Sequence, residues 1–209
     1  MCDRSVKRPP RRLPTLIGAA FVLGVLAACA AADTQTELLA ASFVADVDGE
    51  VFVGVMVAAH PPDGGTKDVV VYLCDSVNVS TWLFGQTDGD TVVLETDGAR
   101  VDLLLGADAV SGQVELAGGD AQPFTAVAAE GDAGLFRAEE ETVEGLHVGG
   151  WIILNDLEQR GALTLGGAIV ESPTLDPAAG EADSSIGTLT TERCFRNPWT
   201  GERICRALE

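Results

Sequence analysis

Histidine is the scarcest catalytic side chain in this sequence, with two among 209 residues. His60 precedes a pair of prolines, and His147 opens an apolar run. Neither has a second histidine or a cysteine at the short spacing that zinc ligands use. After folding, a histidine beside Asp156 or Ser80 would make a general acid–base site. That arrangement defines one hypothesis for the chain, a hydrolase that uses His60 or His147.

Other side chains give weaker chemical signals. The sequence contains no Gly-x-Ser-x-Gly elbow and no phosphate-binding loop, so nucleophilic and nucleotide chemistry lack a signature. Acidic turns at 46–50 and 88–90 lack the further ligands and the distal glutamate of a calcium loop. Cys74 stands in an apolar run, which predicts a buried, unreactive thiol. We therefore predict no catalytic, cofactor-binding or metal-binding residues, no cofactor and no enzymatic activity.

The N-terminal residues have the pattern of an export signal. Five basic residues lie within the first twelve positions, and an uncharged run covers 13–28 and ends in Leu26-Ala27-Ala28-Cys29. A basic segment, an apolar segment and small residues in this order are typical of a secretory signal peptide. The last four residues resemble the lipobox of bacterial lipoproteins. The resemblance implies cleavage before Cys29 and a diacylglycerol group on its thiol.

Two other interpretations of this segment stay open. A membrane-spanning anchor needs roughly 20 apolar residues, and this run is shorter. A plain secretory peptide would be cut after Ala28 or Ala30. We expect a signal peptide at 1–28, a tether at 29–41 and a lipid-anchored protein on the extracytoplasmic side of the cell membrane. Two acyl chains on Cys29 suffice for stable anchoring.

Charge limits the partners that the protein can have. The whole chain has 13 basic and 32 acidic residues, and removal of residues 1–28 leaves 8 basic and 31 acidic residues. A protein this negative stays soluble and repels nucleic acids and anionic lipids. We therefore expect no nucleic-acid partner and a membrane contact through the lipid on Cys29. A general acidic bias of the source proteome would give the same composition.

The middle of the chain has the pattern of an antiparallel β domain. Short apolar runs alternate with Asp-Gly and Gly-Gly pairs, which favour tight hairpins, and no stretch keeps helical periodicity. This pattern predicts an all-β domain at 42–170, an antiparallel meander that forms a barrel or a two-sheet sandwich. The aromatic residues, about one per strand, are expected in its core. The expected strands are 42–47, 50–59, 68–75, 78–85, 91–96, 99–105, 109–117, 121–129, 134–139, 146–154 and 160–169.

The same region contains several short motifs. They are Val71-Tyr72-Leu73-Cys74-Asp75, Trp82 with Gly85, Asp97-Gly98-Ala99, Phe124-Thr125-Ala126, Ala133-Gly134-Leu135-Phe136-Arg137 and Gly149-Gly150-Trp151-Ile152. Together they resemble a pattern in uncharacterised secreted or lipid-anchored actinobacterial proteins. The resemblance covers roughly residues 50–165. It implies one β domain and brings no activity with it.

The C-terminal part differs in composition. Residues 171–185 combine two prolines and one glycine with mostly small and polar residues, which predicts a linker. Four of the eight basic residues that follow Cys29 lie in the last 17 positions. Residues 186–209 are therefore predicted to form a small, basic C-terminal extension.

Cys194 and Cys205 are expected to close this extension as a disulfide. A hairpin with a four-residue loop after Asn197 places these two cysteines opposite each other, and Arg196 opposite Arg203. Outside the cytoplasm a close pair of cysteines oxidises. The alternative is a helix that begins at Asn197, which would hold the cysteines too far apart to pair easily.

These features favour a binding or structural role. The expected partner is a protein, a glycan or a small apolar ligand at the cell surface. The basic loop around Trp199, with Arg196 and Arg203 beside it, is a candidate partner contact. The alternatives are the hydrolase described above, which would act outside the cytoplasm, and an inhibitor or accessory factor that presents the Trp199 loop.

Overall fold

The computed structural model describes residues 37–60, 65–196, 198 and 203–206. Every regular element within these residues is a β-strand, and none is a helix. The all-β, antiparallel fold predicted from the sequence is therefore confirmed. In the described part of the chain no helix is long and apolar enough to cross a membrane. The predicted signal peptide, Cys29 and most of the tether lie outside the described residues.

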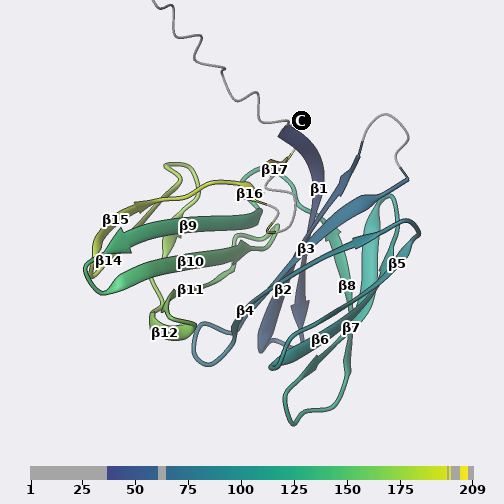
Figure 1. Cartoon of the computed structure of the whole chain (residues 1–209), viewed down its shortest axis with the longest axis horizontal. Helices are drawn as coiled ribbons and strands as arrows, with labels where there is room; N and C mark the ends of the chain where they lie inside the picture. The colour runs from purple at the N-terminus through teal and green to yellow at the C-terminus, as the bar shows by residue number, and fades with distance from the viewer. Residues whose placement is uncertain (1–36, 61–64, 197, 199–202, 207–209) are drawn as a thin grey trace, which may run out of the picture. The chain divides into compact units, whose positions relative to one another are not determined.

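The first eight strands form a nearly closed barrel, in the order β4-β3-β2-β1-β8-β7-β6-β5 (Figure 1). Two meanders of four strands meet where β1 pairs with β8. Within each meander, strands that are neighbours in sequence pair antiparallel. The strands are β1 (Glu37–Val47), β2 (Val51–Ala59), β3 (Lys67–Cys74), β4 (Ser80–Thr87), β5 (Thr91–Glu95), β6 (Ala99–Leu105), β7 (Ala109–Leu116) and β8 (Gln122–Ala128).

The barrel closes by side-chain packing between its two edge strands, β4 and β5. Gly85 in β4 leaves room for Leu94 of β5, whose side chain would collide with any Cβ atom at position 85. The hydroxyl of Thr87 also donates a hydrogen bond of 2.7 Å to the carbonyl of Thr91. The two edges therefore meet without a ladder of backbone hydrogen bonds.

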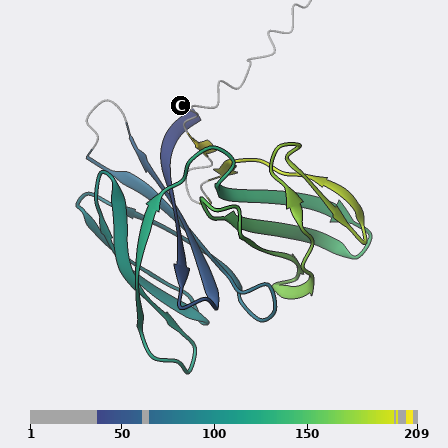
Figure 2. The same ribbon diagram turned by 180° about the vertical axis from the view of Figure 1, so that it is seen from behind.

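Two smaller sheets and a C-terminal hairpin complete the fold. The second sheet lies along the β1–β4 side of the barrel. The third sheet packs on the face of the second sheet that points away from the barrel (Figures 1 and 2). The second sheet has β9 (Gly134–Thr142), β10 (Gly145–Ile153), β11 (Gln159–Leu165) and β12 (Ala168–Glu171). The third has β13 (Leu175–Asp176), β14 (Glu181–Ser184) and β15 (Gly187–Thr190). The hairpin has β16 (Cys194–Arg196) and β17 (Arg203–Arg206).

Three hydrophobic core clusters follow from this layering. The first fills the barrel, the second lies between the barrel and the second sheet, and the third lies between the second and third sheets. In β3, Val69, Val71 and Leu73 point into the barrel, whereas Val70 and Tyr72 face the second sheet. Because both faces of β3 are covered, its sequence is apolar without alternation. In β5, which has one covered face, buried and exposed residues alternate.

The predicted core aromatics lie mostly outside the barrel. The barrel interior is filled by aliphatic side chains together with Phe43 and Phe124. Phe52 and Tyr72 lie between the barrel and the second sheet, and Phe136 and Trp151 lie between the second and third sheets. Trp82 and Phe84 are half-buried against the second core cluster. The aromatic set thus joins layers and does not line a ligand chamber inside the barrel.

The structure corrects the predicted domain boundaries at both ends. The predicted tether runs to residue 41, whereas β1 begins at Glu37 and buries Ala40. The predicted linker at 171–185 contains the end of β12 and all of β13 and β14. Leu175 and Ala182 in these strands are buried in the third core cluster. The composition of a segment does not show whether it packs against strands that are distant in sequence.

The predicted extension at 186–209 is also not a separate unit. Strand β15 belongs to the third sheet, and β17 pairs in parallel with β1 from Glu37 to Ala40. The strand predicted at 160–169 is divided, because Gly166 and Gly167 have φ angles of +59° and +85° and form a two-residue hairpin turn.

The loop between β3 and β4 is organised by one carboxylate. Oδ1 of Asp75 accepts hydrogen bonds of 2.7 Å from the backbone N–H groups of Val77, Asn78 and Val79. Partial desolvation raises the pKa of this carboxyl, but the backbone donors outweigh it and hold the pKa below its ordinary value. Ser76, within the same loop, has a φ angle of +69°. The carboxylate therefore stabilises a conformation that is strained for a serine.

This loop predicts a pH-dependent stability. A lowered pKa means that Asp75 stabilises the folded state fully above its unfolded pKa of about 3.9, and that this stabilisation is lost as the pH falls through the folded pKa. Asp75→Asn is therefore expected to be less stable than the wild type at pH 7, with a difference that shrinks below about pH 4. Urea unfolding at a series of pH values measures this difference. A difference that stays constant down to pH 2 would contradict the assignment.

Candidate binding cleft

The candidate site is a cleft between β9, the residues that follow β15 and the C-terminal hairpin. Its volume is about 250 Å³. Backbone hydrogen bonds in both directions between Arg137 and Glu192, of 3.0 and 2.8 Å, hold the segment before β16 against β9. The polar residues that line the cleft are Arg137, Glu139, Thr190, Glu192, Arg196 and Arg203.

Arg137 is the most enclosed charge of the cleft. Its Nε and Nη2 atoms donate hydrogen bonds of 2.9 and 2.6 Å to Oε1 of Glu139. Its guanidinium group lies 4.6 Å from the ring centre of Trp82, and Trp82 in turn packs on Phe195. Nη1 of Arg137 is buried and has no hydrogen-bond partner among the described residues. This arginine therefore has donor capacity that none of the described residues uses.

Arg196 and Arg203 line the cleft from the hairpin. They are opposite each other in the β16–β17 register, as the sequence analysis predicts. Nη2 of Arg203 lies 2.9 Å from Oε2 of Glu192. This ion pair offsets the repulsion between Arg203 and the opposite Arg196. Trp199, the third predicted contact residue, lies outside the described residues.

The hairpin is closed by a disulfide between Cys194 and Cys205, which confirms this pairing over the helical alternative. Their Cα atoms are 4.0 Å apart. The backbone N–H of Arg206 donates to the carbonyl of Arg193, so the cysteines form the next, non-hydrogen-bonded pair. One cross-link thus fixes both the register of the hairpin and the position of Arg203.

The other two C-terminal arginines fasten the hairpin to the loop before β9. Arg206 donates hydrogen bonds to the carbonyls of Ala129 and Ala133. Arg193 donates to the carbonyl of Gly131 at 3.2 Å and lies over the ring of Phe136. Of the four C-terminal arginines, Arg193 and Arg206 therefore have a structural role, whereas Arg196 and Arg203 line the cleft.

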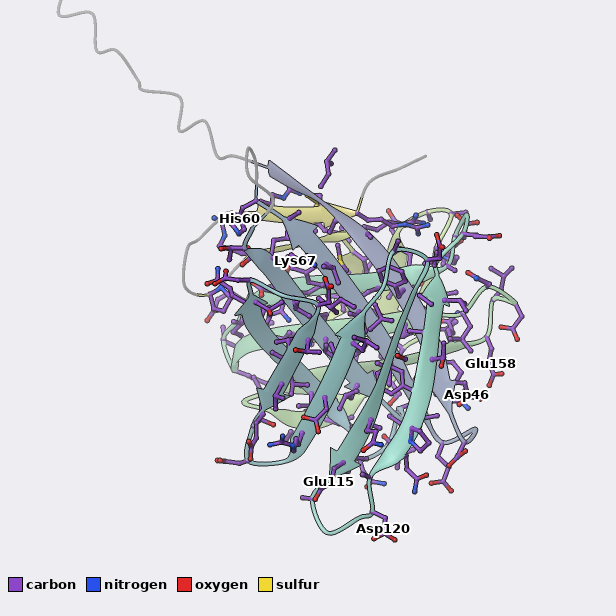
Figure 3. The ribbon with its side chains drawn as sticks, turned by 90° about the vertical axis from the view of Figure 1, so that its right-hand side faces the viewer. Asp46, His60, Lys67, Glu115, Asp120 and Glu158 are labelled. Atoms are coloured by element: carbon purple, nitrogen blue, oxygen red, sulfur yellow. A yellow bond between two sulfur atoms is a disulfide. The ribbon has the colours of Figure 1, made fainter. Side chains whose placement is uncertain are left out.

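The two histidines do not meet. His60 follows β2, with its Nε2 atom 3.0 Å from Oδ2 of the buried Asp68. His60 and Lys67 lie at one end of the barrel, opposite the end that carries Glu115 (Figure 3). His147 is buried in β10 of the second sheet, and its Nδ1 atom lies 3.4 Å from the hydroxyl of Thr142.

Ser80 and Asp156, the predicted partners of the histidines, make hydrogen bonds with other residues. The hydroxyl of Ser80 is 2.9 Å from that of Tyr72, and Oδ1 of Asp156 accepts a hydrogen bond from the N–H of Glu158. The shared site with Asp156 or Ser80 is therefore not formed. Neither histidine lines the cleft.

The remaining candidates for chemistry are held by structural contacts. Cys74 is unpaired and buried, and its burial raises the pKa of the thiol. In the acidic turn at 88–90, Asp90 pairs with Lys67 at 2.8 Å and Asp88 accepts a hydrogen bond from Thr66. No three histidine, cysteine, aspartate or glutamate side chains in the described segments are arranged to hold a metal ion.

No protein-family model, curated protein or solved structure matches this chain. The function proposed below is therefore inferred from the chemistry of the cleft. Sequence patterns indicate Arg196 and Arg203 but not Arg137 or Glu192, which join the site only through tertiary pairing. The one sequence signal for Arg137 is rarity, because it is one of only eight basic residues after position 28.

Proposed function

We propose that the protein is a lipid-anchored, extracytoplasmic binding protein of the cell envelope, and that its binding site is the cleft beside the C-terminal hairpin. The observation that carries the proposal is the convergence of Arg137, Arg196 and Arg203 on one cleft in a strongly acidic chain. A concavity in which a few polar groups converge is typical of a ligand site. The anchor is proposed from the lipobox that ends at Cys29.

The anchor has a direct test. Mass spectrometry of the natively expressed protein is expected to show a mature N-terminus at Cys29 that carries a diacylglyceryl group. Cys29→Ser is expected to accumulate as the uncut precursor, whereas Cys74→Ala is processed normally. An unmodified sulfur at Cys29 in the wild type would end the case for lipidation.

The binding role is tested by photocrosslinking in living cells. A benzophenone amino acid replaces Thr190, an exposed residue that lines the cleft, or Thr96, an exposed residue of the β5–β6 turn. Benzophenone inserts into C–H bonds, so it reports proteins, glycans and lipids alike. A discrete adduct is expected from position 190 and not from position 96, and Arg203→Glu is expected to abolish it. Equal adducts from both positions would contradict a binding site in the cleft.

One observation favours a second candidate function, an extracytoplasmic hydrolase. The carboxylate of Asp68 is buried, contacts His60 at 3.0 Å and accepts a hydrogen bond of 2.6 Å from Gln86. A buried carboxylate next to a partly exposed imidazole is one part of a general-base arrangement. His60→Ala is expected to abolish a hydrolytic phenotype if this is the function. An unchanged phenotype in this variant and in His147→Ala would remove the hydrolase.

A further inference from the structure

We propose that the cleft binds a phosphate group, an inference that rests on the proposed binding function. The chain has eight basic residues after position 28, and three of them, Arg137, Arg196 and Arg203, line this one concavity. They come from β9, β16 and β17. Because the surrounding protein is strongly negative, an anionic ligand gains nothing from long-range attraction and has to be held by local contacts.

The arginines have capacity to exchange partners. Nη1 of Arg137 is buried without a hydrogen-bond partner among the described residues, which is costly for a charged donor. The carboxylates of Glu139 and Glu192, which pair with Arg137 and Arg203, are 51% and 59% exposed. Ion pairs with such exposed carboxylates contribute little to stability. An incoming anion can therefore displace them at small cost.

The number of donors favours phosphate over carboxylate. A carboxylate has two oxygens and is matched by one guanidinium fork. Arg137, Arg196 and Arg203 all line one cleft of about 250 Å³, so a single ligand there has more than one guanidinium group beside it. A phosphate group, with three or four oxygens, accepts hydrogen bonds from several arginines at once, as in phosphate-recognition sites built from arginine clusters.

The position of the cleft makes lipid headgroups one source of such a phosphate. Strand β17, which carries Arg203, pairs with the first residues of β1, starting at Glu37. Eight residue steps separate Cys29 from Glu37, and a fully extended chain of that length spans at most about 29 Å. The proposed anchor thus keeps the start of β1 within that distance of the membrane surface. A soluble phosphate ester is the other source of the same chemistry.

The test uses the mature, lipidated protein in a detergent without phosphate. Inorganic phosphate, a short-chain phosphatidylglycerol below its micelle concentration and acetate are titrated by calorimetry. Saturable binding of at least one phosphate probe is expected, with acetate more than about tenfold weaker. Tighter binding of the lipid indicates a headgroup site, and tighter binding of inorganic phosphate indicates a soluble ester; both results support the proposal. Acetate binding as tight as phosphate, or no saturation by either phosphate probe, would overturn it.

Variants with opposite expected signs make the test specific. Arg203→Gln is expected to weaken binding about tenfold or more, because it removes a charged donor. Glu192→Gln is expected to strengthen binding severalfold, because it removes the carboxylate that competes for Arg203. The matched control is Arg100→Gln, since Arg100 makes similar ion pairs with Glu95 and Asp102 on the barrel. Urea unfolding confirms that each variant is folded.

The outcomes separate this inference from the binding function on which it rests. If position 190 forms its cleft-dependent adduct but no phosphate probe binds, the binding function stands and the phosphate assignment fails. If phosphate binds equally well to the wild type and to Arg203→Gln, the assignment to the cleft fails.

Discussion

Replacing Trp151 with alanine is expected to lower the free energy of unfolding by about 3–5 kcal/mol, the range for removing a fully buried large aromatic. Trp151 has no exposed surface and lies in the core between the second and third sheets. Its ring lies against the backbone of Gly149 and Gly161, where any Cβ atom would collide with it. Its indole N–H donates a hydrogen bond of 2.8 Å to the carbonyl of Pro173. Both the packing and this bond are lost in Trp151→Ala.

A second variant at this position separates the hydrogen bond from the packing, and a variant at an exposed position serves as the control. Trp151→Phe keeps most of the ring and leaves the buried carbonyl of Pro173 without its donor, so a loss of about 1–3 kcal/mol is expected. Val143→Ala, at a fully exposed residue of the β9–β10 turn, is expected to change stability by less than about 0.5 kcal/mol. Urea unfolding followed by far-ultraviolet circular dichroism measures all three without relying on tryptophan fluorescence. If Trp151→Ala were no worse than Val143→Ala, the assigned core between the two sheets would be wrong.

Replacing Cys194 and Cys205 together with serine is expected to lower the free energy of unfolding by about 2–3 kcal/mol. The cross-link closes a short loop, with 11 positions between its ends, and the chain-entropy model gives this range for such a loop. The double substitution is expected to affect ligand binding in the cleft more strongly than stability. Strand β16 has three residues, and a hairpin this short is marginal without a cross-link. Arg196 and Arg203 would lose their fixed positions, so loss of ligand binding is expected.

Reduction gives a matched control for this prediction. Dithiothreitol is expected to reproduce the stability of the double serine variant in the wild type and to have no effect on the double variant itself. A Cys74→Ala protein is expected to respond to the reductant as the wild type does, because Cys74 is unpaired. Thiol titration of the native mature protein should detect Cys74 only after unfolding, since the side chain is buried and the pKa of its thiol is raised. A stability that is insensitive to reductant in the wild type would contradict the bridge.

Local sequence was sufficient where a structural feature depends on neighbouring residues. The turn at Asp48-Gly49 is formed by two adjacent residues with positive φ, as the dipeptide predicts. The register of Cys194 with Cys205 follows from a loop length that can be counted along the chain. In each case the determining contacts lie within about a dozen residues.

Sequence patterns failed where the determining contact is distant. The segment at 171–185 has the composition of a linker, yet Leu175 and Ala182 are buried in the third core cluster. Arg137 lies in an ordinary strand, and only the bridge to Glu192 brings it to the cleft. The barrel interior is mostly aliphatic, with two phenylalanines, although the aromatic residues are spread evenly along the strands. The periodicity of a strand shows which residues share a face, but not which layer covers that face.

The sequence by itself therefore determined the all-β class, the antiparallel pairing of neighbouring strands, the acidic charge and the expected cysteine pairing at the C-terminus. Only the tertiary structure showed the nearly closed, barrel-like sheet, placed two further sheets beside it and assembled three arginines into one cleft. The physical reason is that backbone hydrogen bonding and turn conformation are set by adjacent residues. A concave site is set by side chains from β9, β16 and β17, whose positions depend on how whole layers pack.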